Sequence, residues 1–145
     1  MATVRSTKEG KLAGTLRLTL GVLFLMTGVM KLAVPMLAHA WSGQLLASGL
    51  PFITLARWTV PFVEIAVGVV LLAGTYVRLA SLVVIGIMLV ATYVHLTVDD
   101  PSLFPLQPNE PIIPLIVIGM GSYVLWKGGG SYIRFWSIWQ TDPRQ

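Results

Sequence analysis

The sequence predicts an all-α membrane protein, folded as a bundle of four transmembrane helices in a single integral membrane domain over residues 1–145. Hydrophobic residues make up 55% of the chain and charged residues only 11%, against roughly 25% charged in an ordinary soluble domain. The mean hydropathy of +0.79 is also typical of a membrane protein. A helix needs about 20 apolar residues to cross a bilayer. Four apolar runs are close to this length. They lie at about residues 12–34, 60–77, 79–98 and 112–126.

Charge and cysteine content exclude several classes of function. The net charge is +4, but the basic residues are scattered over helix ends and loops, with no Lys/Arg-rich block. The sequence therefore favours lipid headgroups, and not nucleic acid, as the partner of these cations. The chain has no cysteine, which excludes a disulfide, a thiol redox pair and a Cys-ligated iron–sulfur cluster. Any electron transfer needs a bound cofactor or a partner protein.

The first span, which Pro35 closes, carries its charges and glycines on one face. A spacing of four, three, four and three places five residues in one helical stripe. They are Arg17, Gly21, Phe24, Gly28 and Lys31. The two glycines are predicted to let a neighbouring helix approach closely, and Gly68 of the second span is predicted to do the same. Lys31 lies deep enough that it must either extend to the interface or find a partner.

The N-terminus raises a question of targeting. The uncharged run 18–30 follows several basic residues and precedes Ala38-His39-Ala40, a pattern close to that of a secretory signal peptide. Lys31 interrupts this pattern between the apolar run and the cleavage motif. We therefore expect an uncleaved first span.

Residues 36–58 are too short and too mixed in polarity to span a membrane. Leu37, Trp41, Leu45 and Ser48 fall at helical intervals before Gly49 and Pro51. This spacing predicts a short interfacial helix after the first span, with Trp41 as its anchor.

The second span is predicted to begin just before Pro61, which a first helical turn tolerates. Glu64 would then lie in that turn, where the helix macrodipole favours a carboxylate. The third span follows so closely that the two spans must form an antiparallel hairpin, with Arg78 at its turn. Four prolines in residues 99–111 exclude a helix and favour a stiff extended cap.

The C-terminal segment after the fourth span is predicted to be amphipathic and aromatic. Tyr132, Phe135, Trp136 and Trp139 recur at i, i+3, i+4 and i+7. This face either lies among lipid headgroups or docks on a partner subunit. The two tryptophans are thus candidate headgroup or partner contacts.

Orientation follows from the distribution of basic residues. With the N-terminus inside, eight of the ten Lys/Arg lie on the inner side, in the N-terminal tail, at the turn with Arg78 and at the C-terminus. The positive-inside rule then predicts that both termini are cytoplasmic. Arg17 and Arg78 are both expected near the inner surface, facing headgroup phosphates.

The same topology brings candidate site residues together at the outer surface. Lys31 and Glu64 are predicted to form an intramembrane ion pair, which Tyr93 and His95 extend into a polar pocket. The pair is either a structural clamp or part of a ligand or quinone site. His95 is either a satisfied interfacial residue or a proton donor to a quinone carbonyl. No metal site is expected, and no residue is assigned as catalytic.

Two segments, RLTLGVLFLMTGVMKL and EIAVGVVLLAGTYVRLA, together with GGGSY near the end, resemble the DoxX family of small four-helix membrane proteins. The positions that match its pattern are Arg17, Gly21, Gly28, Lys31, Glu64, Gly68 and Arg78. The resemblance implies a four-helix bundle with a link to quinone-dependent redox work, because one related branch supplies a membrane subunit of thiosulfate:quinone oxidoreductase.

On this basis we expect an integral subunit or partner in a quinone-linked electron-transfer system of a bacterial-type inner membrane. A quinone is the candidate cofactor, with none bound covalently, and the expected partners are the lipid bilayer and other membrane subunits or further copies of the chain. The alternative is a non-catalytic accessory subunit that assembles or stabilises a larger membrane complex.

Overall fold

The computed structural model describes residues 3–130, with side chains from Gly10 onward. Within these residues the chain is helical and contains no strand. Its elements are α1 (Thr3–Ala33), α2 (Pro35–Ala47), α3 (Ile53–Ala73), α4 (Val77–Thr97), the 3₁₀ helix η1 (Pro101–Leu103) and α5 (Ile112–Lys127). The predicted aromatic segment with Trp136 and Trp139 lies outside the described residues.

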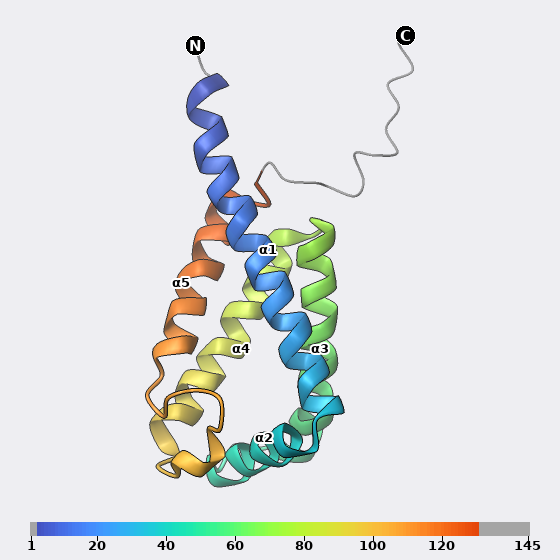
Figure 1. Cartoon of the computed structure of the whole chain (residues 1–145), viewed down its shortest axis with the longest axis vertical. Helices are drawn as coiled ribbons and strands as arrows, with labels where there is room; N and C mark the ends of the chain where they lie inside the picture. Colours follow the sequence, from blue (N-terminus) through green and yellow to red (C-terminus); the bar gives the residue numbers. More distant parts are fainter. Residues whose placement is uncertain (1–2, 131–145) are drawn as a thin grey trace.

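Four of these helices form the predicted membrane bundle (Figure 1). In the described part of the chain, α1 from Gly10, α3 and α4 are long and apolar enough to span a bilayer, and α5 is a shorter apolar helix. The most extensive packing joins α1 to α3 and α4 to α5. Contacts of α1 with α5 and of α3 with α4 close the ring, whereas α2 lies across one end.

The outer surface of the bundle is apolar. In the most apolar windows of α3 and α4 only 28% of the residues are buried inside the bundle. On α4, Leu82, Leu89 and Leu96 recur every seven residues and are 54–67% exposed. So large an apolar surface is stable in lipid and not in water. The chain is therefore a multi-pass membrane protein.

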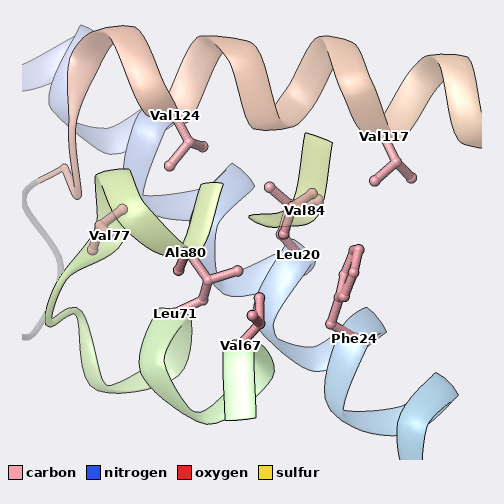
Figure 2. Close-up of a cluster of buried hydrophobic side chains, with 9 residues drawn as sticks. All are labelled: Leu20, Phe24, Val67, Leu71, Val77, Ala80, Val84, Val117 and Val124. Carbon is pink, nitrogen blue, oxygen red and sulfur yellow. The ribbon is translucent and has the colours of Figure 1, made fainter. Parts of the chain in front are cut away.

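The bundle core fills the half that adjoins the turn between α3 and α4 (Figure 2). Each of the four bundle helices contributes to it. The buried residues are Leu20, Phe24, Val67, Leu71, Val77, Ala80, Val84, Val117 and Val124. All nine are apolar, so apolar packing holds most of this half together; the side chains of Arg17 and Ser81 are also buried in it.

Glycines hold α1 and α3 at close range. A Cβ atom at Gly28 would lie 2.7 Å from the carbonyl oxygen of Pro61, and one at Gly68 would lie 2.6 Å from the backbone nitrogen of Leu25. A Cβ at Gly21 would lie 3.2 Å from the Gly68 carbonyl oxygen. Because these neighbours are backbone atoms, a larger residue would push the two helices apart.

The limits of α3 differ from the predicted second span, 60–77. The helix begins at Ile53, directly after Phe52, whose positive φ of 59° makes the turn. It ends at Ala73, capped by Gly74 at φ 73°. Pro61 and Glu64 therefore do not lie in the first turn, and that prediction was wrong. Glu64 lies about three turns into the helix, beyond the reach of its N-terminal dipole.

The short helix predicted before the second span is confirmed as α2. The proline-rich segment that follows α4 is mostly non-helical, as predicted, but it contains the single turn η1. Asp100 caps this turn by accepting hydrogen bonds from the Ser102 hydroxyl at 2.6 Å and the Ser102 backbone N–H at 2.9 Å. These bonds hold the pKa of the Asp100 carboxyl below its ordinary value, so it remains ionised at neutral pH.

The glycine contacts predict that Gly68→Leu destabilises the bundle. Overpacking of this kind typically lowers the free energy of unfolding by about 1–3 kcal/mol, here by separating α1 from α3. Gly119→Leu is the matched control, because a Cβ there would meet no heavy atom within 4 Å. Thermal unfolding in detergent measures both variants. Equal melting temperatures would show that the close approach of α1 and α3 does not contribute to stability.

Candidate functional site

A cavity of about 410 Å³ occupies the half of the bundle opposite the apolar core. Figure 1 shows that the α1/α3 pair and the α4/α5 pair separate toward this end, where α2 crosses the gap. The cavity is lined by the second halves of α1 and α4, the first halves of α3 and α5, one face of α2 and residues 105–107. Most of its lining side chains are apolar, so the few polar groups define its chemistry.

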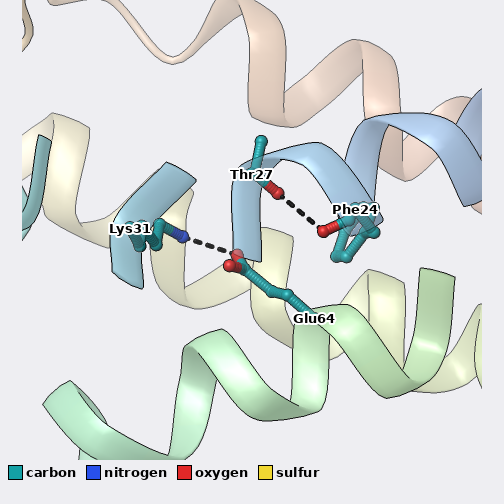
Figure 3. Close-up of polar contacts among 4 residues, drawn as sticks. All are labelled: Phe24, Thr27, Lys31 and Glu64. Atoms are coloured by element: carbon teal, nitrogen blue, oxygen red, sulfur yellow. Dashed lines mark hydrogen bonds and ion pairs between the residues drawn. The ribbon is translucent and has the colours of Figure 1, made fainter. Parts of the chain in front are cut away.

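The predicted ion pair lies in the wall of this cavity (Figure 3). Lys31 Nζ donates a hydrogen bond to Glu64 Oε1 at 2.6 Å. Glu64 is only 1% exposed, whereas the Lys31 side chain, near the end of α1, is 20% exposed. Lys31 Nζ also lies 4.3 Å from the ring centroid of Trp41 on α2, a cation–π distance. The lysine thus joins three helices.

Two buried polar atoms of the cavity residues lack a hydrogen-bond partner within the described part of the chain. Glu64 Oε2 is an acceptor and Trp41 Nε1 is a donor. Buried polar groups are nearly always satisfied, because each unmet one retains its full desolvation penalty. A molecule that offers both a hydroxyl donor and an oxygen acceptor matches this combination.

His95 also lines the cavity and is anchored to the loop that follows α4. Its side chain is largely buried, and Nδ1 lies 2.8 Å from the carbonyl oxygen of Asn109. A carbonyl oxygen only accepts, so Nδ1 carries the proton and Nε2 is the acceptor of the neutral ring. The ring also packs on Phe104, with centroids 4.3 Å apart. Nδ1 therefore anchors the loop, and Nε2 takes no part in that contact.

Tyr93 is not among the residues that line the cavity. Its side chain is 46% exposed, and its hydroxyl donates to the carbonyl oxygen of Ser48 at 3.4 Å. This bond ties α4 to the end of α2. The structure thus gathers Lys31, Glu64 and His95 around one cavity and leaves Tyr93 outside it.

The two arginines expected at the inner surface differ from each other. Arg17 does not face headgroups as predicted, because its side chain is 0% exposed. The glycine segment after α5 packs over it, and a Cβ at Gly129 would lie 3.9 Å from Arg17 Cδ. Arg78 is exposed and lines a shallow hollow beside the turn between α3 and α4.

Sequence reasoning missed the contribution of α2 to the cavity. Trp41 was expected at the lipid interface, and Gln44 was not singled out. Both line the cavity, and Gln44 Nε2 donates to the Leu103 carbonyl oxygen at 2.6 Å, which fastens the loop over α2. The spacing of residues 37, 40, 41 and 44 places them on one face of a helix. This face carries two apolar residues followed by an indole and an amide, a pattern that could have indicated a cavity wall.

The family model described as DoxX matches residues 12–97. The chain belongs to the DoxX family. The matched stretch covers α1 from Leu12 through α4, and it contains the Lys31–Glu64 pair, Trp41 and His95. Helix α5, which completes the cavity of this DoxX protein, lies beyond the match. Comparison with curated proteins and with solved structures found no match.

The ion pair predicts a large effect of Lys31→Met on stability. The substitution leaves the Glu64 carboxylate buried without its cation, and removing one partner of a buried pair lowers the free energy of unfolding by about 3–5 kcal/mol. The double variant Lys31→Met/Glu64→Gln is expected to recover most of this loss, because the stranded charge is gone. Unfolding in detergent measures both.

Arg78→Met is the control, since an exposed cation is expected to change stability by no more than about 0.5 kcal/mol. If Lys31→Met behaved like Arg78→Met, the ion pair would not stabilise the fold.

Proposed function

We propose that this DoxX-family protein binds a quinone in the cavity and acts as an integral subunit or partner in a quinone-linked electron-transfer system. The observation that carries the proposal is the unpartnered Glu64 Oε2 beside Lys31 in a largely apolar cavity. A bacterial-type inner membrane with both termini cytoplasmic belongs to the same proposal. It rests on the excess of Lys and Arg near the chain ends and at the turn with Arg78.

A quinone fits the cavity in size and polarity. The volume of about 410 Å³ falls within the roughly 300–1,000 Å³ typical of ligand pockets. A quinone head is a flat apolar ring with one oxygen at each end. An apolar wall with a few polar groups suits such a ring, because the wall binds the ring and the polar groups orient its oxygens.

The ion pair can hold both redox forms. Lys31 spends one N–H on Glu64 and has others for a quinone carbonyl, whereas Glu64 Oε2 can accept from a quinol hydroxyl. Reducing a quinone to a quinol consumes two electrons and two protons. The electrons must come from a redox partner protein, because the chain has no cysteine and no group of its own that supplies them. Glu64 and His95 Nε2 are the proton-exchanging groups of the cavity.

The alternative is a non-catalytic accessory subunit. One observation favours it, namely that His95 already uses one nitrogen and a ring face to hold the loop, so the histidine has a structural role without any ligand. In that case the cavity would hold lipid, and the purified protein would carry no quinone.

Trp41→Phe tests quinone binding with little risk to folding. Phenylalanine keeps an aromatic ring beneath Lys31 but removes the unpartnered Nε1 donor. Loss of one hydrogen bond, typically about 0.5–1.5 kcal/mol, predicts a roughly 2- to 13-fold weaker affinity for a quinone. Titration of protein in lipid nanodiscs with a long-chain quinone, followed by quenching of tryptophan fluorescence, measures it.

Trp126→Phe is the matched control for this prediction. Lys127 Nζ lies 4.3 Å from the Trp126 ring, the same distance as Lys31 from Trp41, but Trp126 is on the outer surface and does not line the cavity. Its replacement is expected to leave the affinity unchanged. Absence of quinone binding by the native protein would reject the quinone proposal and favour the accessory role.

A further inference from the structure

We infer that the ligand enters and leaves the cavity sideways, from the hydrocarbon core of the bilayer, through an opening between α3 and α4. Its polar head then lies at the Lys31–Glu64 end and its apolar chain extends through the opening into lipid. This inference rests on the proposed quinone site, and it adds the route of access and the class of ligand, a membrane-dissolved molecule with a polar head and an apolar chain.

The wall of the cavity is open at two residues of α4. Gly86 and Val90 line the cavity and are nevertheless exposed on the surface of the bundle, Val90 to 47%. A Cβ atom at Gly86 would meet no heavy atom within 4 Å. These two residues are one helical turn apart, so they mark a continuous strip of α4 that borders both the cavity and the outside.

Helix geometry places this strip on the side of α4 that is turned away from α5. Helix α5 packs on α4 around Val84 and Ile85, since a Cβ at Gly121 would lie 3.3 Å from each of those side chains. At 100° per residue, Gly86 and Val90 point well away from that contact. The neighbour of α4 on the other side of the ring is α3.

Helix α3 does not close the strip. It contributes Val60 and Glu64 to the cavity lining, but α3 and α4 diverge from their shared turn at Gly74 and Tyr76, as Figure 1 shows. Their contacts are far less extensive than those within the α1/α3 and α4/α5 pairs. The opening therefore lies between the two arms of this hairpin.

The depth of the opening selects the kind of ligand. Gly86 is near the middle of α4, whose 21 residues span about 31 Å, close to the thickness of the hydrocarbon core. The opening thus faces lipid tails. Glu64 lies nine residues before the end of α3 and Gly86 nine residues after the start of α4, so the ion pair and the opening lie at a similar distance from the turn that joins these helices. A ligand with a polar head at the ion pair and an apolar chain in the opening fits this arrangement, whereas a charged solute from water does not.

The aqueous end of the cavity is covered by a helix and a loop that polar contacts hold in place. Helix α2 lies across it, the Gln44 amide holds the loop carbonyl of Leu103 at 2.6 Å, and His95 holds that of Asn109 at 2.8 Å. Phe104 is buried beneath this loop against His95. Leu106 of the same loop lines the cavity and is 66% exposed, so this cover is fastened without sealing the cavity. The opening between α3 and α4 is assigned to the ligand because it faces lipid tails.

Gly86→Phe tests the route, with Gly119→Phe as the matched control. Both glycines lie in bundle helices where a Cβ would meet open space, but Gly119 is on α5 and does not line the cavity. Mixing nanodiscs that hold the protein with vesicles that hold a long-chain quinone, and following tryptophan quenching, gives the rates of loading and release. Gly86→Phe is expected to slow both rates about tenfold or more, as gated access does, and Gly119→Phe neither.

Each outcome decides between distinct claims. If the native protein binds no quinone, the proposed function fails and the route fails with it. If the native protein binds and Gly86→Phe loads and releases at native rates, the site stands but the lateral route is overturned. If Gly86→Phe speeds release while loading is unchanged, the phenylalanine occupies the cavity without blocking an opening, which also overturns the route.

Discussion

The fold depends on keeping one carboxylate, that of Glu64, inside a membrane bundle. A charge at mid-membrane costs about 2.5–3.5 kcal/mol on insertion scales, and Lys31 at 2.6 Å compensates it. The two side chains reach each other because α1 and α3 pack closely at Gly21, Gly28 and Gly68, where a Cβ atom would press against the neighbouring helix. The ion pair and the glycine contacts therefore act together, since the glycines allow the approach that the charges require. Removing either is expected to weaken the other.

The close packing of α1 against α3 also explains why the half of the bundle near α2 is hollow. Helices α1 and α3 form one closely packed pair and α4 and α5 another, and the two pairs meet through the apolar core near the turn between α3 and α4. Toward the opposite end the pairs separate, and α2 with the proline-rich loop covers the gap. Lys31 lies where these parts meet, because it contacts Glu64 of α3 and the Trp41 ring of α2. The charge that stabilises the pair is thus also presented to the cavity.

Much of this arrangement could be predicted from the sequence, because long apolar runs and isolated charges are local signals. The four-helix bundle was predicted correctly, and Lys31 and Glu64 were placed at one depth by topology alone. The start of α3 was not predicted, since it depends on a positive φ at Phe52, a residue that rarely adopts one. Arg17 is buried, and Gly129, which lies beside it, is far away in sequence. Trp41 and Gln44 were missed for the same reason, because their role arises from contacts with α1 and the loop.

The polar groups of the cavity argue for more than a structural clamp. A clamp needs only the Lys31–Glu64 contact, and a buried carboxylate that served stability alone would use both oxygens. Instead Oε2 of Glu64 and Nε1 of Trp41 lack partners in the described part of the chain, and both belong to residues that line the same apolar cavity. The desolvation penalty of these atoms is offset once a ligand with a donor and an acceptor binds there. An apolar ring with polar oxygens is such a ligand, and an opening toward lipid is the route by which it would arrive.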